Sequence, residues 1–400
     1  MKKVLALVLA LAMFLSLASF ASAEGFSGEV KIWVAEATVD FTKEQVEAFK
    51  AAHPEYANMT VLVEPVGEDD AANKVITDVE AGADIFGFAQ DQLVRLVSAG
   101  ALEEVEPGNA EIVKAENDAG SVGAVTLNGT MYAYPLTSDN GYFLYYDSSV
   151  ISDPSTVEQI LADCEAAGKN FYFQINSGWY QPAFFFGFGC DISYEVEGSQ
   201  FVGLNCDYAS ENGVKALKAM IETAKSPAFQ NGSSMSNATN VAAIVDGVWD
   251  ANAAKDAFGD NYATAKLPTV AGVQLSGFGG FKMLGIKPQT DDDKLAACDA
   301  LAAFLSSEEV QLARYNAVGW GPSNLNAQKS DAVQADKALS ALGAQLAYAK
   351  PQGNYPNGYW SLAEALGDDV LADKLDDADD AKLMEILTTF AATCETYLDK

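Results

Sequence analysis

The sequence is poor in the residue types that carry most catalytic and metal chemistry. Its 400 residues include one histidine and five cysteines. The cysteines are scattered and none has a CxxC spacing, so no metal or redox motif is predicted. The sequence also lacks the HExxH, GxSxG, P-loop and dinucleotide-binding motifs. We therefore expect no catalytic centre, no metal site and no cofactor.

Cysteine pairing is left open by the spacing. Cys190 and Cys206 flank a predicted hairpin at 192–205, and they could form a disulfide in an oxidising compartment. Buried free thiols are the alternative, because free cysteine packs as a small apolar residue.

Basic residues are scarce relative to acidic ones. There are 24 Lys and Arg residues against 56 Asp and Glu residues, which gives a formal net charge of −32. Such a surface repels phosphate backbones, so nucleic acid is excluded as a partner. Anionic substrates are disfavoured for the same reason, which leaves neutral or cationic small molecules.

Long apolar runs are confined to the N-terminus. Lys2 and Lys3 precede an apolar run over 4–20, which ends at the small-residue segment 21–23. This pattern predicts a secretory signal peptide over 1–23 and an exported, extracytoplasmic protein, with a retained membrane anchor as the alternative. No cysteine follows the run to accept a lipid, and no later run approaches about 18 apolar residues.

The order of apolar patterns predicts an α/β fold. Strand patterns at 29–34, 59–63 and 82–88 alternate with helical patterns at 42–52 and 73–81. This alternation is typical of a parallel sheet, and a chain of this length has room for about two domains. Because ligands bind beyond the carboxyl ends of such strands, Glu36 and Asp91 are placed near a predicted cleft.

Later segments predict hairpins and helices. Asn128-Gly129 predicts a tight hairpin over 125–133. Helical patterns cover 154–167, 211–224, 293–305 and 308–316. The acidic run 368–380 lacks the spacing and glycine of a calcium loop, so it predicts a solvated helix-loop-helix.

The stretch 246–282 contains the clearest candidate for ligand contact. Trp249 follows a short apolar strand at 242–245 and lies where a helix begins, while the glycine-rich segment 276–280 suits a crossing between two lobes. Trp179 and Trp360 lie in other segments with polar or glycine neighbours. Aromatic faces pack on the apolar face of a sugar ring, and carboxylates accept strong hydrogen bonds from its hydroxyls.

These segments resemble the extracellular sugar-binding proteins of ABC importers, most closely the maltodextrin-binding members of Gram-positive bacteria. The resemblance is densest over 246–282 and over 129–147, GTMYAYPLTSDNGYFLYYD, where Asp139 stands at the position of the family's sugar-facing acid. It implies a two-lobed α/β fold of the periplasmic-binding-protein type (type II), each lobe a mixed sheet flanked by helices. The implied lobes are 24–137 with 280–332 and 142–275 with 336–400.

The resemblance also implies a function and a set of contacts. It implies a monomeric receptor that captures α-1,4-linked gluco-oligosaccharides by lobe closure and delivers them to ABC transporter membrane subunits. Xylo- or galacto-oligosaccharides are the alternative ligands, and a glycoside hydrolase, which needs two spaced carboxylates, is a further alternative. The implied contact residues are the acids Glu36, Asp91 and Asp139 and the aromatic residues Phe88, Trp179, Tyr180, Trp249, Tyr359 and Trp360.

Three positions depart from the family pattern. Phe88 replaces a family tryptophan, Gln92 replaces an arginine common in Gram-negative members, and Glu364 replaces another such arginine. Trp179 matches its family position only approximately. The polar contacts to a sugar are therefore expected to differ from those of the Gram-negative proteins.

Overall fold

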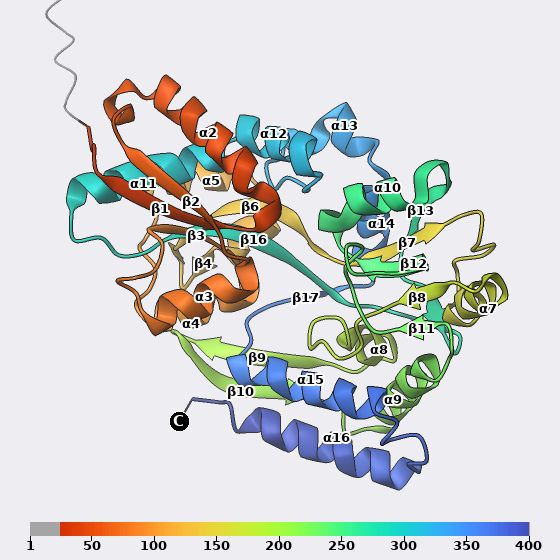
Figure 1. The fold of residues 1–400 in the computed structure, drawn as a ribbon. Helices are drawn as coiled ribbons and strands as arrows, with labels where there is room; N and C mark the ends of the chain where they lie inside the picture. The colour runs from red at the N-terminus through yellow and green to blue at the C-terminus, as the bar shows by residue number, and fades with distance from the viewer. Residues whose placement is uncertain (1–24, 400) are drawn as a thin grey trace, which may run out of the picture.

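Two mixed β-sheets organise the chain, and each lies at the centre of one lobe (Figure 1). The computed structural model describes residues 25–399, so the predicted signal peptide lies outside the described residues. Within this range no helix is both long enough and apolar enough to cross a membrane. The predicted two-lobed α/β fold with mixed sheets is confirmed.

The first lobe is built on a six-stranded sheet of order β17-β16-β3-β1-β2, with β6 also paired to β16. β1 is parallel to β2 and β3, whereas β16 is antiparallel to β3 and β6. All five residues of β3 are apolar or glycine and buried, as expected for a strand covered on both faces. The bounds are β1 Glu29–Val34, β2 Thr60–Pro65, β3 Ile85–Ala89, β6 Ala133–Gly141, β16 Phe278–Ile286 and β17 Lys350–Pro351.

Helices flank this sheet, with α2 packed on α11 and α3 packed on β3. α2 ends at Ala52, since the residue before Pro54 disfavours helical backbone angles. The helices are α2 Val39–Ala52, α3 Glu68–Thr77, α4 Leu93–Ser98, α5 Pro107–Glu116, α6 Ala119–Ala124, α11 Asp292–Leu305 and α12 Glu308–Val318. Shorter elements are η1 Glu36–Thr38, η2 Pro54–Tyr56, η3 Gln90–Gln92 and the hairpin of β4 Thr126–Leu127 with β5 Thr130–Met131.

The second lobe is built on a five-stranded sheet of order β11-β8-β12-β7-β13. Its strands are β7 Phe143–Asp147, β8 Asn170–Tyr172, β11 Phe229–Gln230, β12 Val241–Asp246 and β13 Tyr262–Ala265. Two hairpins accompany the sheet, β9 Ile192–Glu197 with β10 Gln200–Cys206 and β14 Thr269–Val270 with β15 Val273–Gln274.

Amphipathic helices surround the second sheet. In α9, Val214, Leu217 and Ile221 recur at helical spacing and are buried, and the Ser210 side chain caps the first turn. The helices are α7 Val157–Ala167, α8 Pro182–Gly187, α9 Glu211–Ala224, α10 Ala251–Phe258, α13 Asp331–Gln334, α14 Lys337–Leu346, α15 Asn357–Leu371 and α16 Asp380–Glu395. Short 3-10 turns are η4 Val248–Asp250, η5 Gly259–Asn261 and η6 Ala327–Lys329.

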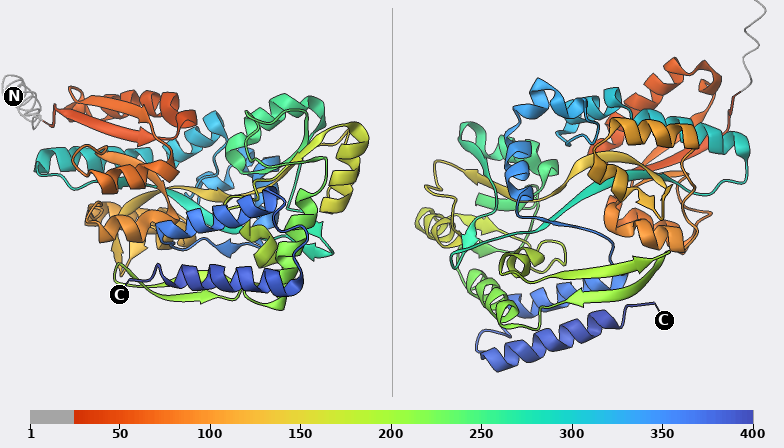
Figure 2. Two further views of the ribbon diagram at one scale, coloured as in Figure 1. Left: turned by 60° about the horizontal axis from the view of Figure 1, so that its bottom comes forward. Right: turned by 180° about the vertical axis from the view of Figure 1, so that it is seen from behind.

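Two long strands connect the lobes, and both views in Figure 2 show them between the two bodies. β6 continues into β7 with only Tyr142 between them, and β16 enters the first sheet after the β14–β15 hairpin. The chain passes between the sheets a third time from α12 through η6 and α13 to α14. β6 and β16 pair at Gly141 with Gly279 and at Asn140 with Gly280, so glycines allow close approach here.

Three apolar cores lie within residues 25–399. One fills the first lobe, and the largest fills the second lobe around α8, α9 and α15. The third lies on the α10 and α14 side of the second sheet; it includes Trp320, and Ala35 of the first lobe packs against it. The lobes therefore share apolar contact beside the connecting strands.

Most predicted helices and strands agree with the structure. One helix and one possible disulfide differ from it. The helix predicted over 73–81 is α3, which begins at Glu68, because acidic residues after Gly67 favour a helix N-terminus. All five cysteines are free, so the alternative of a Cys190–Cys206 disulfide is not realised.

Candidate functional site

Lys282 lies at the centre of the region where the two lobes meet. Its strand β16 pairs there with β3 at Ala89 and with β6 at Thr137. The Lys282 ammonium lies 4.5 Å from the ring centroid of Trp249 and 4.1 Å from that of Trp320. Lys282 is buried, and a desolvated cation–π contact contributes about 2 kcal/mol. One cation from the first sheet is thus held between two indole rings.

Trp249 reaches this cation from the second lobe. β12 ends at Asp246, Gly247 is extended, and η4 then turns Trp249 against β6. The indole folds back over Gly247, where an added Cβ would lie 2.1 Å from the ring. Glycine at 247 is therefore required for this ring position.

Asp139 and Trp320 come together through the loop after α12. The Gly321 backbone N–H donates a hydrogen bond to the Asp139 carboxylate, and a Cβ at 321 would lie 3.0 Å from the Asp139 Cβ. Trp320 also lines a small cavity with Val34 and Leu136 of the first lobe. The 319–322 loop thus brings the Trp320 indole to Lys282 and holds the Asp139 carboxylate through Gly321.

Burial governs the charge state of this cluster. Burial raises the pKa of Asp139, and the positive charge of Lys282 opposes that rise. Burial also lowers the pKa of the nearby Arg314 to about 10, against the opposing effect of Asp139. Arg314 donates hydrogen bonds to the backbone oxygens of Leu136 and Leu305, so it supports the strand that carries Asp139.

An aromatic row continues from Trp249 into the second lobe. The Trp179 ring lies 5.8 Å from the Trp249 ring and 4.7 Å from the Tyr142 ring, centroid to centroid. Tyr142 donates its hydroxyl to the Trp179 backbone oxygen at 3.0 Å. Tyr180 donates its hydroxyl to buried Asp246 at 2.8 Å, directly behind η4. The row is therefore fixed by hydrogen bonds beneath it.

Trp360 lies beside this row, in the first turn of α15. A Cβ at Gly178 would lie 3.1 Å from the Trp360 ring, so Trp360 packs against the turn that carries Trp179. The Trp360 ring contacts Tyr355 and Tyr359, with centroids 5.3 Å and 4.9 Å away.

Asp91 joins the site through an amide network between the end of β3, β6 and the segment after β17. Gln352 donates to the Asp91 carboxylate at 2.8 Å and accepts from Asn140 at 2.9 Å. Asp91 also accepts from Gln92, which in turn accepts from Arg95. Asp91 and Asp139 are therefore linked through neighbouring residues of β6 and the segment after β17.

Several buried polar atoms around this site have no hydrogen-bond partner among residues 25–399. Such atoms are rare in folded proteins and commonly mark a place for a ligand or water. Thr137 Oγ1 and Asp139 Oδ1 lie on β6, the strand that faces Lys282, and Gln90 follows β3. The partnerless atoms here are Gln90 Oε1, Thr137 Oγ1, Asp139 Oδ1 and the indole nitrogens of Trp179, Trp320 and Trp360.

The structure brings most of the predicted contact residues together, but not all of them. Trp179, Trp249, Trp360, Asp91 and Asp139 lie in the connected set described above. Tyr180 and Tyr359 are buried behind it; Tyr359 donates its hydroxyl to Gly178, so both support the aromatic row.

One predicted contact requires correction. Phe88 is fully buried in the first-lobe core, so its ring is not available to a ligand. Glu36 is exposed in η1, directly after Ala35, which packs against the apolar core that includes Trp320, so Glu36 stays a predicted contact.

Lys282 and Trp320 were missed by the sequence-based list. A lysine inside the otherwise apolar and glycine strand FGGFKMLGI is a signal that could have identified Lys282. Trp320 lies between two glycines, Gly319 and Gly321, a pattern similar to that of Trp249 after Gly247.

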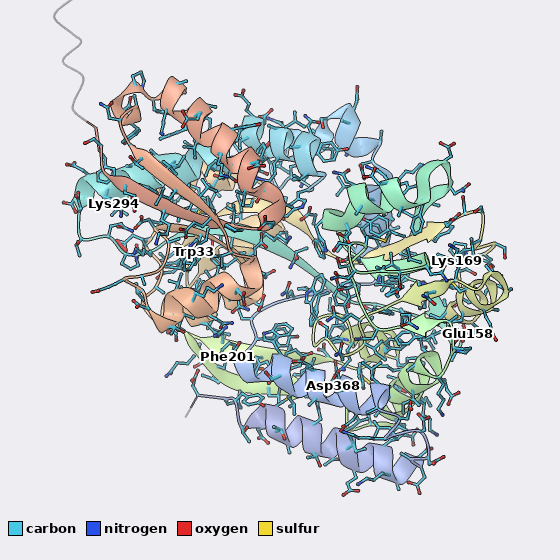
Figure 3. The ribbon with its side chains drawn as sticks, viewed as in Figure 1. Trp33, Glu158, Lys169, Phe201, Lys294 and Asp368 are labelled. Atoms are coloured by element: carbon cyan, nitrogen blue, oxygen red, sulfur yellow. The ribbon has the colours of Figure 1, made fainter. Side chains whose placement is uncertain are left out.

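A large cavity lies elsewhere in the second lobe. A cavity of about 840 Å³ opens on the outer side of the second lobe, and Glu158 marks its position far from Trp33 of the first lobe (Figure 3). Its lining is mostly apolar and contains none of the predicted contact residues. We therefore identify the site by the charged, aromatic and partnerless polar groups around Lys282 and not by the size of a cavity. The lining includes Val157, Leu161, Phe188, Lys215 and Val270.

No cluster of three or more His, Cys, Asp or Glu side chains in the described part of the chain could hold a metal ion. The acidic run 368–380 joins α15 to α16.

Comparison with known proteins gives a consistent family assignment. A family model described as bacterial extracellular solute-binding protein matches residues 44–341. A galactooligosaccharide-binding protein of Bacillus subtilis is 24% identical over 378 residues, which cover 90% of this chain and 88% of that protein. A maltooligosaccharide ABC transporter solute-binding lipoprotein of Streptococcus pneumoniae is 28% identical over 343 residues, which cover 78% of this chain and 77% of that protein.

Solved structures show the same fold. One, determined with acarbose, has a TM-score of 0.80 at 26% identity and covers 92% of this chain and 98% of its own. A ligand-free maltodextrin-binding protein from L. casei has a TM-score of 0.76 at 24% identity and covers 92% of this chain and 99% of its own.

Proposed function

This chain belongs to the bacterial extracellular solute-binding proteins, and from that premise we propose that it is the exported receptor of an ABC importer for neutral α-1,4-linked gluco-oligosaccharides. The observation that carries the proposal is the convergence of Trp249, Trp179 and Trp360 from the second lobe with Lys282 and Asp139 from the first. Indole faces would stack on sugar rings, and the partnerless polar atoms would bond sugar hydroxyls.

Lobe closure provides the proposed mechanism. A sugar between the lobes gains contacts from both only when they are closed, so it shifts an open–closed equilibrium by its difference in affinity for the two states. The closed form would be recognised by the importer's membrane subunits. We propose that the receptor acts as a monomer outside the cytoplasm, with lobes formed by 24–137 with 280–332 and by 142–275 with 336–400. Within the last range, β17 at 350–351 pairs with β16 in the sheet of the first lobe.

The relatives support capture without chemistry, since they are named as binding proteins. The proposal is therefore of a non-enzymatic receptor. Prolonged incubation with maltotetraose should leave the sugar intact, and release of shorter sugars would overturn this part of the proposal.

A second ligand class is favoured by one specific observation. The B. subtilis relative that covers 90% of this chain is named as a galactooligosaccharide-binding protein. Function depends on the site residues and not on the scaffold, so a galacto-oligosaccharide is the second candidate.

A thermal-shift panel tests the ligand class. The purified protein is heated with maltotriose, maltotetraose, a β-galactotriose, xylotriose or raffinose. A ligand at 100 times its dissociation constant stabilises the folded state by about 2.7 kcal/mol, so a matching sugar should raise the melting temperature clearly. A shift with maltotriose and maltotetraose is expected. A shift with β-galactotriose alone would select the second candidate, and no shift with any sugar would overturn the receptor function.

A further inference from the structure

Lys282 is a charged residue in the middle of a buried strand. β16 is hydrogen-bonded to β3 on one side and to β6 on the other, so the Lys282 backbone cannot move away from the site without breaking both pairings. The residue is 7% exposed, and burying a cation is unfavourable unless other groups compensate for the lost water. Its position therefore requires an explanation.

The surroundings compensate only part of that loss. The ammonium faces the rings of Trp249 and Trp320, and the charge of the Asp139 carboxylate attracts it. An ammonium carries three N–H donors and no acceptor. Ring faces attract its charge, but they do not provide the directional acceptors that three N–H groups can use.

Polar atoms of neighbouring residues also lack hydrogen-bond partners within residues 25–399. Thr137 Oγ1 belongs to the residue paired with Lys282 across the sheet, and Asp139 Oδ1 lies two residues farther along β6. The Trp320 indole N–H belongs to one of the two rings around the ammonium. The Thr137 hydroxyl also favours the charged form of the Asp139 carboxylate, so these two groups partly satisfy each other. The Trp320 N–H and the Lys282 ammonium remain as donors that sugar hydroxyls can satisfy, because each hydroxyl both donates and accepts.

We propose that Lys282 is a ligand-binding residue, whose ammonium donates hydrogen bonds to hydroxyl oxygens of a neutral sugar stacked on Trp249 while it holds the Trp249 and Trp320 rings in position. This inference rests on the proposed receptor function and adds the polar group that acts with the indoles. Lys282 belongs to the sheet of the first lobe and Trp249 to the second lobe, so the contact forms only when the lobes are together.

A purely structural role is the competing explanation. In that case Lys282 would only balance the charge of Asp139, and its loss would lower ligand-free stability without a separate effect on affinity. The two roles are separated by measuring ligand-free melting temperature and sugar affinity on the same variants.

The experiment compares Lys282→Met, Lys282→Arg and the control Lys266→Met by calorimetric titration with maltotetraose. Lys266 also lies over an aromatic ring, with its ammonium 4.9 Å from the Tyr348 ring centroid, but it is outside the site. Lys282→Met keeps the apolar stem and removes the donors, so affinity should fall at least about tenfold while the ligand-free melting temperature stays the same or rises. Lys282→Arg should retain more affinity than Lys282→Met, and Lys266→Met should bind as the wild type does.

Each outcome has a defined meaning. If the wild type binds maltotetraose and Lys282→Met binds within twofold of it, the role of Lys282 is overturned and the receptor function stands. If affinity falls only in step with a loss of ligand-free stability, the structural explanation replaces the proposal. If Lys282→Met does not fold, two other variants decide. Lys282→Arg with unchanged affinity for maltotetraose and unchanged tryptophan fluorescence supports the proposal. Lys282→Gln with wild-type affinity contradicts it. If the wild type binds none of the panel sugars, both proposals fall together.

Discussion

At the residue scale, the Trp249 ring depends on the glycine two positions before it. Gly247 has φ −93° and ψ −178°, which any residue can adopt, so a substitution there is limited by space and not by the backbone. Gly247→Ala would place a methyl group 2.1 Å from the indole and force the ring to shift. We expect affinity for maltotetraose to fall about tenfold or more, measured by calorimetric titration, since overpacking costs about 1–3 kcal/mol.

A matched control exists in the same lobe. Gly343 lies in α14, and a Cβ there would meet no atom within 4 Å. Gly343→Ala should leave affinity unchanged and stabilise the helix slightly. Equal affinity in Gly247→Ala and the wild type would show that the Trp249 ring position does not matter for binding.

The buried acid beneath this turn predicts a pH dependence. Burial raises the pKa of Asp246 well above its ordinary value, and the Asp250 carboxylate raises it further. In the folded protein Asp246 therefore keeps a proton that it loses above about pH 4 in the unfolded chain. The contribution of Asp246 to the free energy of unfolding therefore falls as the pH rises from about 4 toward the pKa of the folded state.

Asp246→Asn should remove that dependence. Asparagine keeps an oxygen to accept from Tyr180 and the Gly247 N–H but does not titrate. We expect its melting temperature to equal or exceed that of the wild type at pH 7, with the difference shrinking toward pH 4. A wild-type advantage that grows with pH would contradict the assignment of a raised pKa.

Residue type and neighbours placed three tryptophans in one connected set, although their role in binding stays a prediction. Trp179, Trp249 and Trp360 stand beside glycine or polar residues, and all three rings are half-buried. Phe88 was misplaced because the sequence of an all-apolar strand does not show which face meets the core. Lys282 was missed because its environment depends on β3 and β6, which are distant in the sequence.

At the element scale, the β9–β10 hairpin extends from the second lobe to the first, as the right-hand view of Figure 2 shows. At its tip, Gly198 accepts a hydrogen bond from the Asn128 side chain at 3.1 Å, and Ser199 accepts one from Ser98. The hairpin therefore forms polar contacts between the lobes on the side away from α10.

Asn128→Asp tests whether this contact favours the closed form. Asn128 has φ 52°, which aspartate tolerates, and the change replaces a donor with a carboxylate facing a carbonyl. Loss of the bond, about 1 kcal/mol, should open the ligand-free protein and increase its radius of gyration in small-angle X-ray scattering. Saturating maltotetraose should restore the compact form.

Asn240 provides the control for this change. It has φ 54° and also donates its side-chain amide to a glycine oxygen, that of Gly168, but within the second lobe. Asn240→Asp should leave the radius of gyration unchanged. An equal increase in both variants would indicate general loosening and not lobe opening.

Element types were predicted where local signals were strong. The hairpin at Asn128-Gly129 and the helix over 211–224 follow from turn residues and an uninterrupted apolar face. The start of α3 was placed too late, because acidic residues in a first helical turn resemble a loop in sequence. The mixed pairing of β16 with β3 and β6 joins segments far apart in the chain, and no local pattern specifies it.

At the scale of the whole molecule, two lobes meet around one set of residues. β6 and β16 carry Asp139 and Lys282 into the region between the sheets, and η4 brings Trp249 from the other side. The two-lobed fold could be predicted from the family resemblance, whereas composition alone indicated only about two domains. The relative position of the lobes, which decides which side chains meet, required the structure.

The most direct test of a shared site is one calorimetric series with maltotetraose on the wild type, Trp249→Ala and Asp139→Asn. Trp249→Ala removes a contact from the second lobe, and Asp139→Asn alters a contact from the first lobe. Trp33→Phe, in the first-lobe core, serves as a control. We predict saturable binding to the wild type and to Trp33→Phe, a loss of about 2 kcal/mol, or about thirtyfold, for Trp249→Ala, and clear weakening for Asp139→Asn. Wild-type affinity in both Trp249→Ala and Asp139→Asn would contradict a sugar site built by both lobes.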